Sequence, residues 1–181
     1  MSTLEVNKIT PSTGTTITLG DSGDTFTIPS GVTLTNNGSA SGFGKIGQVV
    51  SATTSTQVSM QSTTYADIGL SISITPSSTS SKVYVIAVVT VQGQTGTETN
   101  VTTQHRILRD TTQVVQYNTS RINGVQSQVG SSASLIALDS PSSTSAVTYK
   151  IQQRLEGNGS RTSVSQHNTG ASTIIAMEVL A

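Results

Sequence analysis

The 181-residue sequence contains no cysteine and no tryptophan, and only 10% of its residues are charged. The missing cysteine excludes disulfides and thiolate metal sites. Nine Lys and Arg residues balance nine Asp and Glu residues, so the formal net charge is zero. A nucleic-acid-binding surface would need clustered Lys and Arg, which the sequence does not show, and a polybasic membrane-binding patch is disfavoured for the same reason.

Long hydrophobic runs are also missing. No stretch approaches the ~18 consecutive apolar residues that a membrane-spanning helix requires. The opening residues, MSTLEVNKITPS, lack the apolar region of a secretory signal peptide. We therefore expect synthesis in a cytoplasm and no membrane insertion.

Ser and Thr together supply about a third of the chain, well above the share in an average protein. The apolar residues are mainly β-branched Val and Ile, whereas the usual helix formers Leu, Ala, Glu and Lys are scarce. Thr, Val and Ile favour strands, and Ser, Gly and Asn favour turns. The composition therefore predicts an all-β protein.

Residues 1–38 contain very short apolar-polar-apolar triplets, at 17–19, 26–28 and 32–34, and a further candidate strand at 4–9. Strands this short bury too little surface to offset the entropy of ordering them. They become stable when copies stack as a solenoid or when three chains share one core. We expect an N-terminal stem, either an intertwined trimeric β-prism or solenoid-like, with a loosely ordered arm as the alternative.

Residues 39–44 are rich in Gly and small polar residues and read as a hinge. Residues 45–181 carry nine or ten longer strand patterns and no convincing helix, which favours a jelly-roll-like β-sandwich head. The expected strands are 46–51 paired with 57–61, then 66–75, 82–92, a hairpin of 104–108 with 113–117, a pair of 132–138 with 146–155, and finally 161–166 and 172–180.

The run 82–92 (KVYVIAVVTVQ) is the most apolar in the chain and predicts a central strand, buried on both faces for part of its length. Because both the odd-numbered and the even-numbered residues of this run are apolar, the sequence leaves open which of the two sets faces the core. Either Val83, Val85, Ala87 and Val89 face the core, or Tyr84, Ile86, Val88 and Thr90 do.

Catalytic and metal-binding patterns are weak. His105 and His167 stand in no spaced ligand motif and are expected at the surface or an interface. Asp21 and Asp24 lack the further oxygen ligands of a calcium loop and suit a turn. No G-x-S-x-G motif occurs. We predict no catalytic, cofactor-binding or metal-binding residue, and a glycan-cleaving enzyme is the least favoured function.

Polar stretches at 92–100, 118–130 and 156–161 are expected to be loops. Their amide, hydroxyl and guanidinium groups suit hydrogen bonding to sugar hydroxyls, although plain solvated loops are an equal alternative. With six aromatic residues and no Trp, an aromatic platform for stacking sugars is not expected. The candidate ligand-binding residues are Gln94, Thr97, Asn100, Asn118, Arg121, Asn158 and Arg161.

The opening STLEVNKITPSTGTTITLGDSGDTFTIPSGVTLTNNGSASGFG resembles the N-terminal segment of tail-fibre-like proteins of marine bacteriophages, including cyanophages. The stretches TTYADIGLSISITPSSTSSKVYVIAVVTV, RILRD, ALDSPSSTSAVTYKIQ and STIIAMEVLA resemble the heads of such fibres. This resemblance implies a homotrimeric virion component that joins other virion proteins, in the tail or capsid, through its N-terminal segment. The head would contact host-surface glycans, or alternatively decorate the capsid without binding a receptor.

Overall fold

The structure is a computed structural model that describes residues 9–33, 35, 45–95, 100–123, 128–156 and 161–180. The chain divides into two units, Met1–Phe43 and Gly44–Ala181, which are taken separately below as the N-terminal segment and the head. No helix among the described residues is long and apolar enough to cross a membrane.

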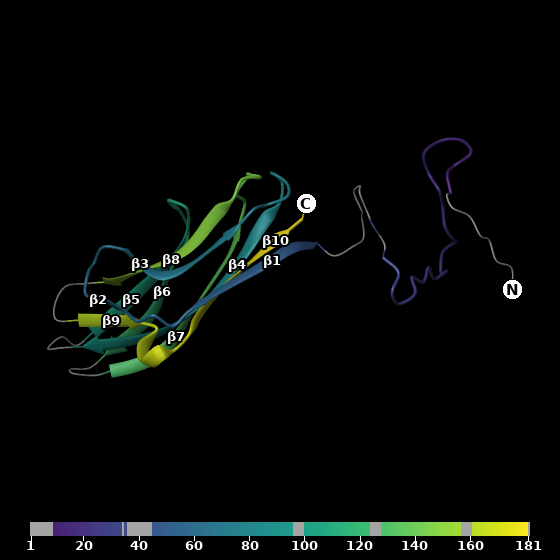
Figure 1. The fold of residues 1–181 in the computed structure, drawn as a ribbon. Coiled ribbons are helices and arrows are strands. Elements are labelled where there is room, and N and C mark those ends of the chain that lie inside the picture. Colours follow the sequence, from purple (N-terminus) through teal and green to yellow (C-terminus); the bar gives the residue numbers. More distant parts are fainter. Residues whose placement is uncertain are drawn as a thin grey trace. The chain divides into compact units, whose positions relative to one another are not determined.

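The described part of the head contains ten strands and one 3₁₀ turn, as an all-β expectation requires (Figure 1). The elements are β1 (Ile46–Thr54), β2 (Val58–Met60), β3 (Ala66–Ile74), β4 (Lys82–Thr95), β5 (Asn100–Arg109), β6 (Thr112–Asn123), β7 (Gln128–Asp139), β8 (Val147–Glu156), β9 (Arg161–Ser165), η1 (His167–Thr169) and β10 (Ser172–Val179).

The strands form two antiparallel sheets that pack face to face. Sheet A has the order β1-β10-β4-β7, and β9 and β2 extend it beyond the end of β10. Sheet B has the order β3-β8-β5-β6. Eight strands in these orders, with chain crossings between the sheets, make a jelly roll of two Greek keys. The expected fold class of the head is therefore confirmed.

The alternation of apolar and polar residues determines which side of each strand faces the core. In β3, Ile68, Leu70, Ile72 and Ile74 are buried and the residues between them are exposed. The central strand β4 pairs with β7 along one edge and with β10 and then β9 along the other. Its inward side chains are Val83, Val85, Ala87, Val89 and Val91, all essentially buried, which settles the open register in favour of the first set.

Three expectations about the head are wrong. β1 pairs with β10 and β2 with β9, so the first two strands are not a pair. β7 and β8 are not a pair either, because the chain crosses from sheet A to sheet B between them. The outward side of β4 is not buried, since its side chains remain half-buried or exposed. In a Greek key, neighbours along the chain often belong to different sheets.

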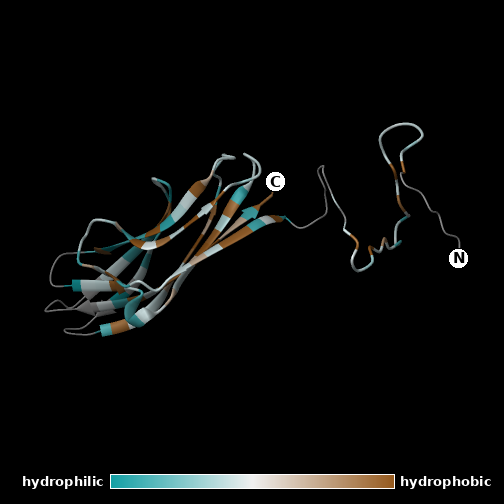
Figure 2. Ribbon diagram, in the orientation of Figure 1, coloured by the Kyte–Doolittle hydropathy of each residue, from teal (hydrophilic) through white to brown (hydrophobic). Residues whose placement is uncertain are grey.

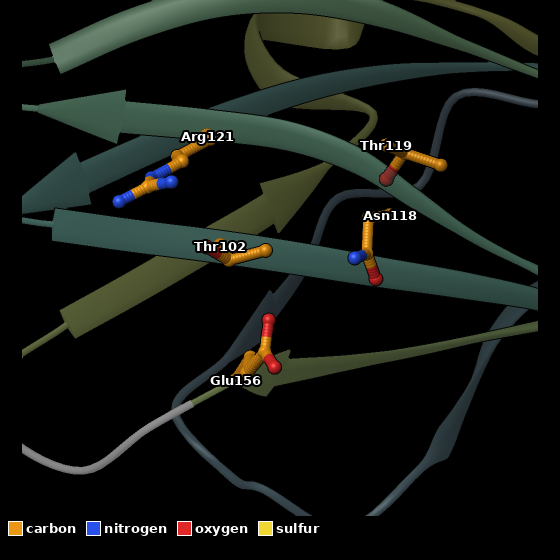
Figure 3. Close-up of a pocket in the computed structure, with 5 residues that line it drawn as sticks. All are labelled: Thr102, Asn118, Thr119, Arg121 and Glu156. Carbon is orange, nitrogen blue, oxygen red and sulfur yellow. The ribbon is translucent and has the colours of Figure 1, made fainter.

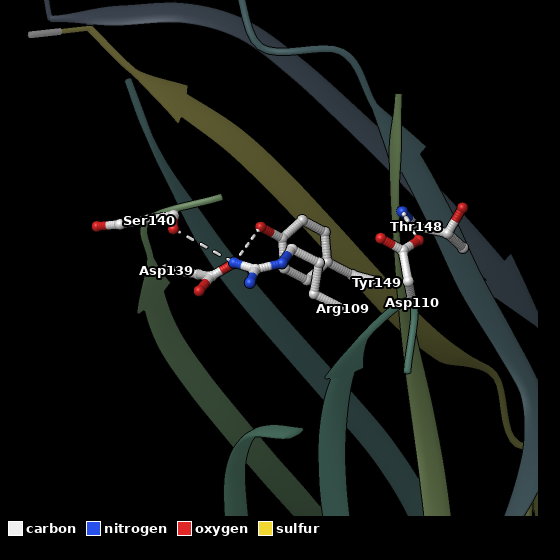
Figure 4. A network of polar contacts seen from close by, with 6 residues as sticks. All are labelled: Arg109, Asp110, Asp139, Ser140, Thr148 and Tyr149. Carbon is white, nitrogen blue, oxygen red and sulfur yellow. Dashed lines mark hydrogen bonds and ion pairs between the residues drawn. The ribbon is translucent and has the colours of Figure 1, made fainter. Parts of the chain in front are cut away.

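Polar contacts join the two sheets at the end of the head where β7 and β5 stop (Figure 4). Arg109 Nη1 lies 2.6 Å from Asp139 Oδ2 and donates to the carbonyl of Ser140 at 3.3 Å. The hydroxyl of the fully buried Tyr149 donates to the same Asp139 oxygen at 2.7 Å. Burial, and then the Asp139 carboxylate, raise the pKa of Tyr149, which keeps its hydroxyl a donor.

A second polar contact holds the β3–β4 connection against β1 and β10. The buried Glu178 accepts hydrogen bonds from the backbone N–H and hydroxyl of Ser77, both at 2.6 Å, and from Gln48 Nε2 at 3.0 Å. Burial acts to raise the pKa of Glu178, but these donors outweigh it and lower the pKa to about 2. The carboxylate is therefore charged and fully hydrogen-bonded at neutral pH.

The N-terminal segment contains no strand among its described residues 9–33 and 35. The triplets at 17–19 and 26–28 were expected to be strands and are not, because a single chain offers them neither a pairing edge nor a core. The candidates at 4–9 and 32–34 fall mainly or partly outside the described residues. Asp21 and Asp24 do form a turn, in which Asp24 N–H donates to the Asp21 carbonyl at 3.1 Å.

Candidate binding site at the distal end of the head

Several strands terminate together at one end of the head, called the distal end here. β4, β6 and β8 stop there, and β5, β7 and β9 begin there. The register fixes this arrangement, because Thr95 pairs with Arg161, and Thr102 pairs with both Glu156 and Arg121. β1 begins and β10 ends at the opposite end (Figure 1).

A shallow pocket of about 280 Å³ lies at the distal end on sheet B. Thr102 stands at its centre between Arg121 and Glu156, because these three residues are cross-strand neighbours on β6, β5 and β8 (Figure 3). Asn118 and Thr119, also from β6, complete the lining. The pocket therefore presents hydroxyl, amide, guanidinium and carboxylate groups within one small area.

A β-bulge in β6 shapes the pocket. Ser120 pairs with Thr103 and Asn118 pairs with Gln104, which leaves Thr119 as the extra residue. The Thr119 hydroxyl turns inward and lies within hydrogen-bonding distance of His105 Nδ1, at 2.5 Å, and of the Thr103 carbonyl, at 3.1 Å. The bulge thus ties the pocket wall to the interior of the sandwich.

The interior beneath the bulge is polar. His105, fully buried, contacts Gln153 Oε1 through Nε2 at 3.0 Å. Gln153 also accepts a hydrogen bond from Ser165 Oγ and donates to the Ser163 carbonyl at 3.3 Å. Burial lowers the pKa of His105 to about 4, so the ring is neutral at physiological pH. The expectation of a surface or interface His105 is wrong, whereas His167 is only partly buried, in η1.

Three of the seven candidate residues gather around Glu156. Asn118 and Arg121 line the pocket, and Arg161 Nη1 donates to the Glu156 carbonyl at 3.2 Å. Gln94 and Asn100 lie on the distal ends of β4 and β5. Thr97 and Asn158 fall outside the described residues. The five that can be placed belong to strands rather than loops, because β4 and β6 run further than their polar sequences indicate.

Sequence reasoning missed Thr102, Thr119 and Glu156. A lone Thr or Glu at a strand end carries no pattern, and a bulge depends on pairing that the sequence does not display. His105 did carry a signal, since it shares its strand parity with the apolar, buried Ile107.

The outer face of sheet B next to the pocket holds one aromatic ring, that of Tyr65. The guanidinium of Arg106 lies 4.0 Å from the ring centroid and that of Arg154 lies 4.8 Å from it. Arg154 Nε also donates to Gln104 Oε1 at 2.6 Å, and Arg106 donates twice to Gln152 Oε1. These cations occupy the ring, so it is not an open stacking platform for a sugar.

The pocket can bind ligands that are rich in hydroxyl groups, because it offers both donors and acceptors. Among the residues lining it, Glu156 is the single carboxylate. Among the described residues, no group of three or more His, Cys, Asp and Glu side chains is placed to hold a metal ion.

No protein-family model and no curated protein matches this sequence. Solved structures that are similar include the infectious bursal disease virus VP2 subviral particle, at 15% identity with a TM-score of 0.36, covering 74% of this chain and 37% of that one. Particles derived from the same virus, with T=1 symmetry, have a TM-score of 0.35 at 15% identity, covering 74% and 36%. The chain spans little more than a third of the length of these structures. The description of the head as a jelly roll rests on its own strand order.

Proposed function

We propose that this chain is a non-enzymatic virion fibre protein, a homotrimer whose N-terminal segment joins other virion proteins and whose distal end contacts host-surface glycans. The observation that carries the proposal is the combination of a jelly-roll head, a fold used by viral capsid and lectin domains, with an N-terminal segment whose spaced apolar side chains are exposed in the single chain. The resemblance of both parts of the sequence to phage fibres points the same way.

The N-terminal segment supports the oligomer. Phe26, Leu19 and Val32 are each at least 60% exposed in the single chain. Large apolar side chains spaced along a short segment gain free energy when copies of the chain bury them together, by about 1.5–3 kcal/mol for each fully buried side chain. Three identical segments that share one core would supply this burial.

The distal pocket supports glycan binding. Arg121, Asn118 and Thr102 can donate hydrogen bonds to sugar oxygens, and Glu156 can accept from sugar hydroxyls. A pocket this shallow gives weak single-site binding, in the millimolar range that corresponds to about 4 kcal/mol. A trimer raises the effective affinity, since its second and third contacts are intramolecular.

Glycoside hydrolysis ordinarily uses a pair of carboxylates. One carboxylate among the pocket-lining residues supports a binding role rather than cleavage. Incubating the protein with host polysaccharide and assaying for new reducing ends tests this point, and release of reducing ends would contradict it.

The main experiment measures binding of the purified full-length protein to host cells and to a panel of bacterial surface polysaccharides. We expect Arg121→Ala and Asn118→Ala each to weaken binding about tenfold, as the loss of one or two hydrogen bonds predicts. Lys82→Ala removes an exposed positive charge at the opposite end of the head and should leave binding unchanged. No binding by the wild-type protein to cells that the particle infects would overturn the receptor role and favour capsid decoration.

A further inference from the structure

The outer face of sheet A is apolar across four strands. Because antiparallel partners project to the same side of a sheet, the register groups the outward residues into rows that run from β1 through β10 and β4 to β7. The first two rows are Val49, Met177, Tyr84 and Leu138, then Ser51, Ile175, Ile86 and Ile136; the third is Thr53, Thr173, Val88 and Ser134. These twelve residues are called the sheet-A face.

The apolar side chains of this face are not core residues. The core takes the alternate positions, such as Val85 and Ala176. On the sheet-A face Leu138 is 56% exposed and Ile136 is 46% exposed. Hydrophobic residues run along β1, β4 and β10 in Figure 2.

The outer face of sheet B is polar, in contrast to that of sheet A. Lys150 Nζ donates to Asp67 Oδ2 at 3.1 Å, Gln152 Nε2 donates to Asp67 Oδ1 at 2.7 Å, and Arg106 continues the network. Antiparallel sheets with one solvated face are normally polar on that side. Sheet B follows this rule and sheet A departs from it, so the sheet-A face has the character of an interface.

The size of the sheet-A face suits the centre of a protein contact. Four strands ~4.8 Å apart and five residues at ~3.4 Å each give roughly 300 Å² in projection. A stable pair of proteins buries about 800 Å² on each partner, with an apolar centre and a polar rim. Thr53, Thr173 and Ser134 lie in the third row and Ser51 lies at the β1 end of the second, so small hydroxyl side chains are available for such a rim.

We infer that the sheet-A face is the surface through which the heads of neighbouring copies of this chain associate. None of its twelve residues is charged, so identical faces meet without repulsion, and partners that bind through charge gain nothing there. Copies tied together by the N-terminal segment are also present at a high local concentration. The inference rests on the proposed oligomeric fibre and extends its interface from the N-terminal segment into the head.

Because the chain lacks cysteine, a single introduced thiol reports whether a surface is covered. Two variants, Ile136→Cys and Ser134→Cys, each place a single thiol on the sheet-A face. The control, Ser71→Cys, places the thiol on the exposed side of β3. The full-length variants are labelled with a thiol reagent over a dilution series. Sedimentation of each sample gives its oligomeric state, and circular dichroism checks the fold.

In samples that sediment as oligomers, the thiols at 134 and 136 should react about tenfold more slowly than the thiol at 71. In samples diluted to monomers, all three should react at the same rate. The Phe26→Ser background, expected to weaken the oligomer, supplies monomers where dilution of the wild-type segment does not.

Equal labelling rates of the three thiols in an oligomeric sample would mean that the heads do not associate through this face. The proposed oligomeric fibre would be unaffected by that result. Slow reaction in a monomeric sample would mean that the chain covers its own face, which also overturns the inference. A protein that sediments only as a monomer at every concentration would remove the proposed oligomer and the inference with it.

Discussion

The hydroxyl of Tyr149 donates a 2.7 Å hydrogen bond to Asp139 Oδ2, which joins the middle of sheet B to the last residue of β7 in sheet A. Arg109 approaches the same carboxylate oxygen at 2.6 Å. The contact lies where the chain leaves sheet A for sheet B, so it fixes a crossing that backbone pairing alone does not fix.

Tyr149→Phe should lower the free energy of unfolding by about 1–3 kcal/mol, since it removes a buried donor to a charged acceptor. Urea denaturation of the full-length protein measures the change. Ser71→Ala, which removes an exposed hydroxyl of β3, is the control and should change stability by less than about 0.5 kcal/mol. Equal effects of the two substitutions would contradict a structural role for this hydrogen bond.

Stability should fall as the pH drops from about 6.5 to about 4, because His105 is buried as the neutral ring. Its folded-state pKa of about 4 lies below the usual 6.5, so the unfolded chain binds a proton first as the pH falls. The full loss is about 3 kcal/mol, reached near pH 4. Urea denaturation between pH 8 and 4 follows it.

His105→Gln should remove the decline in this window, whatever its effect on stability at neutral pH. His167→Gln, at a partly exposed site, should leave the decline in place. A wild-type stability curve that is flat between pH 6.5 and 4 would show that His105 is not buried in solution.

Glu178 should make the folding stability depend on pH in a second, more acidic range. Its folded-state pKa of about 2 lies below the unfolded value of 4.5, so its contribution is complete above pH 4.5 and is lost as the pH falls towards 2. Glu178→Gln turns an amide N–H₂ towards the donors of Ser77 or Gln48 and should cost about 1.5–3 kcal/mol at pH 7. Glu156→Gln, at an exposed strand end, is the control for the loss of one negative charge.

Phe26→Ser and Ile28→Ser should weaken the oligomer more than they harm the head. Each removes an apolar contact worth about 1.5–3 kcal/mol per chain, and a trimer counts the loss three times. Sedimentation measures the oligomeric state, and thermal unfolding followed by the β-sheet circular dichroism reports on the stability of the head. If the wild-type protein is already a monomer at micromolar concentration, the trimer is wrong.

Binding to host cells should depend little on salt. The net charge is zero and the distal pocket contains one guanidinium and one carboxylate, so few counterions are released on binding. Adsorption of the purified oligomer at low and high ionic strength tests this. A steep decline with salt would show that charge attraction, rather than many hydrogen bonds, drives the contact.

The strands of the head could be predicted from the sequence because each depends on local alternation. Ile68 to Ile74 is the clearest case, where every second residue is buried. The β5–β6 hairpin could be predicted, because its two strands are neighbours along the chain. The pairing of β1 with β10 and of β7 with β4 could not, because these partners lie far apart along the chain. The register of β4 stayed open for a physical reason, since Ile86 and Val88 on its outer side are as apolar as the core positions between them.

The candidate site was predicted in part. Asn118 and Arg121 belong to a polar stretch that sequence reasoning could single out, and the fold brings them together. Glu156 and Thr102 join them only through cross-strand pairing, and Thr119 only through a bulge. Predicting these three requires the register, which arises from the packing of the whole sandwich.

The pairing of β1 with β10 has a mechanical consequence. Among the described residues, β1 pairs with β10 alone, from Ile46 opposite Val179 to Thr54 opposite Ser172. Leu180 N–H also donates to the Lys45 carbonyl at 2.7 Å. Tension between Lys45 and the distal end acts along β1, across hydrogen bonds that lie perpendicular to it. The bonds share the load and must break together rather than one after another, so the head resists pulling along its long axis better than peeling from its side.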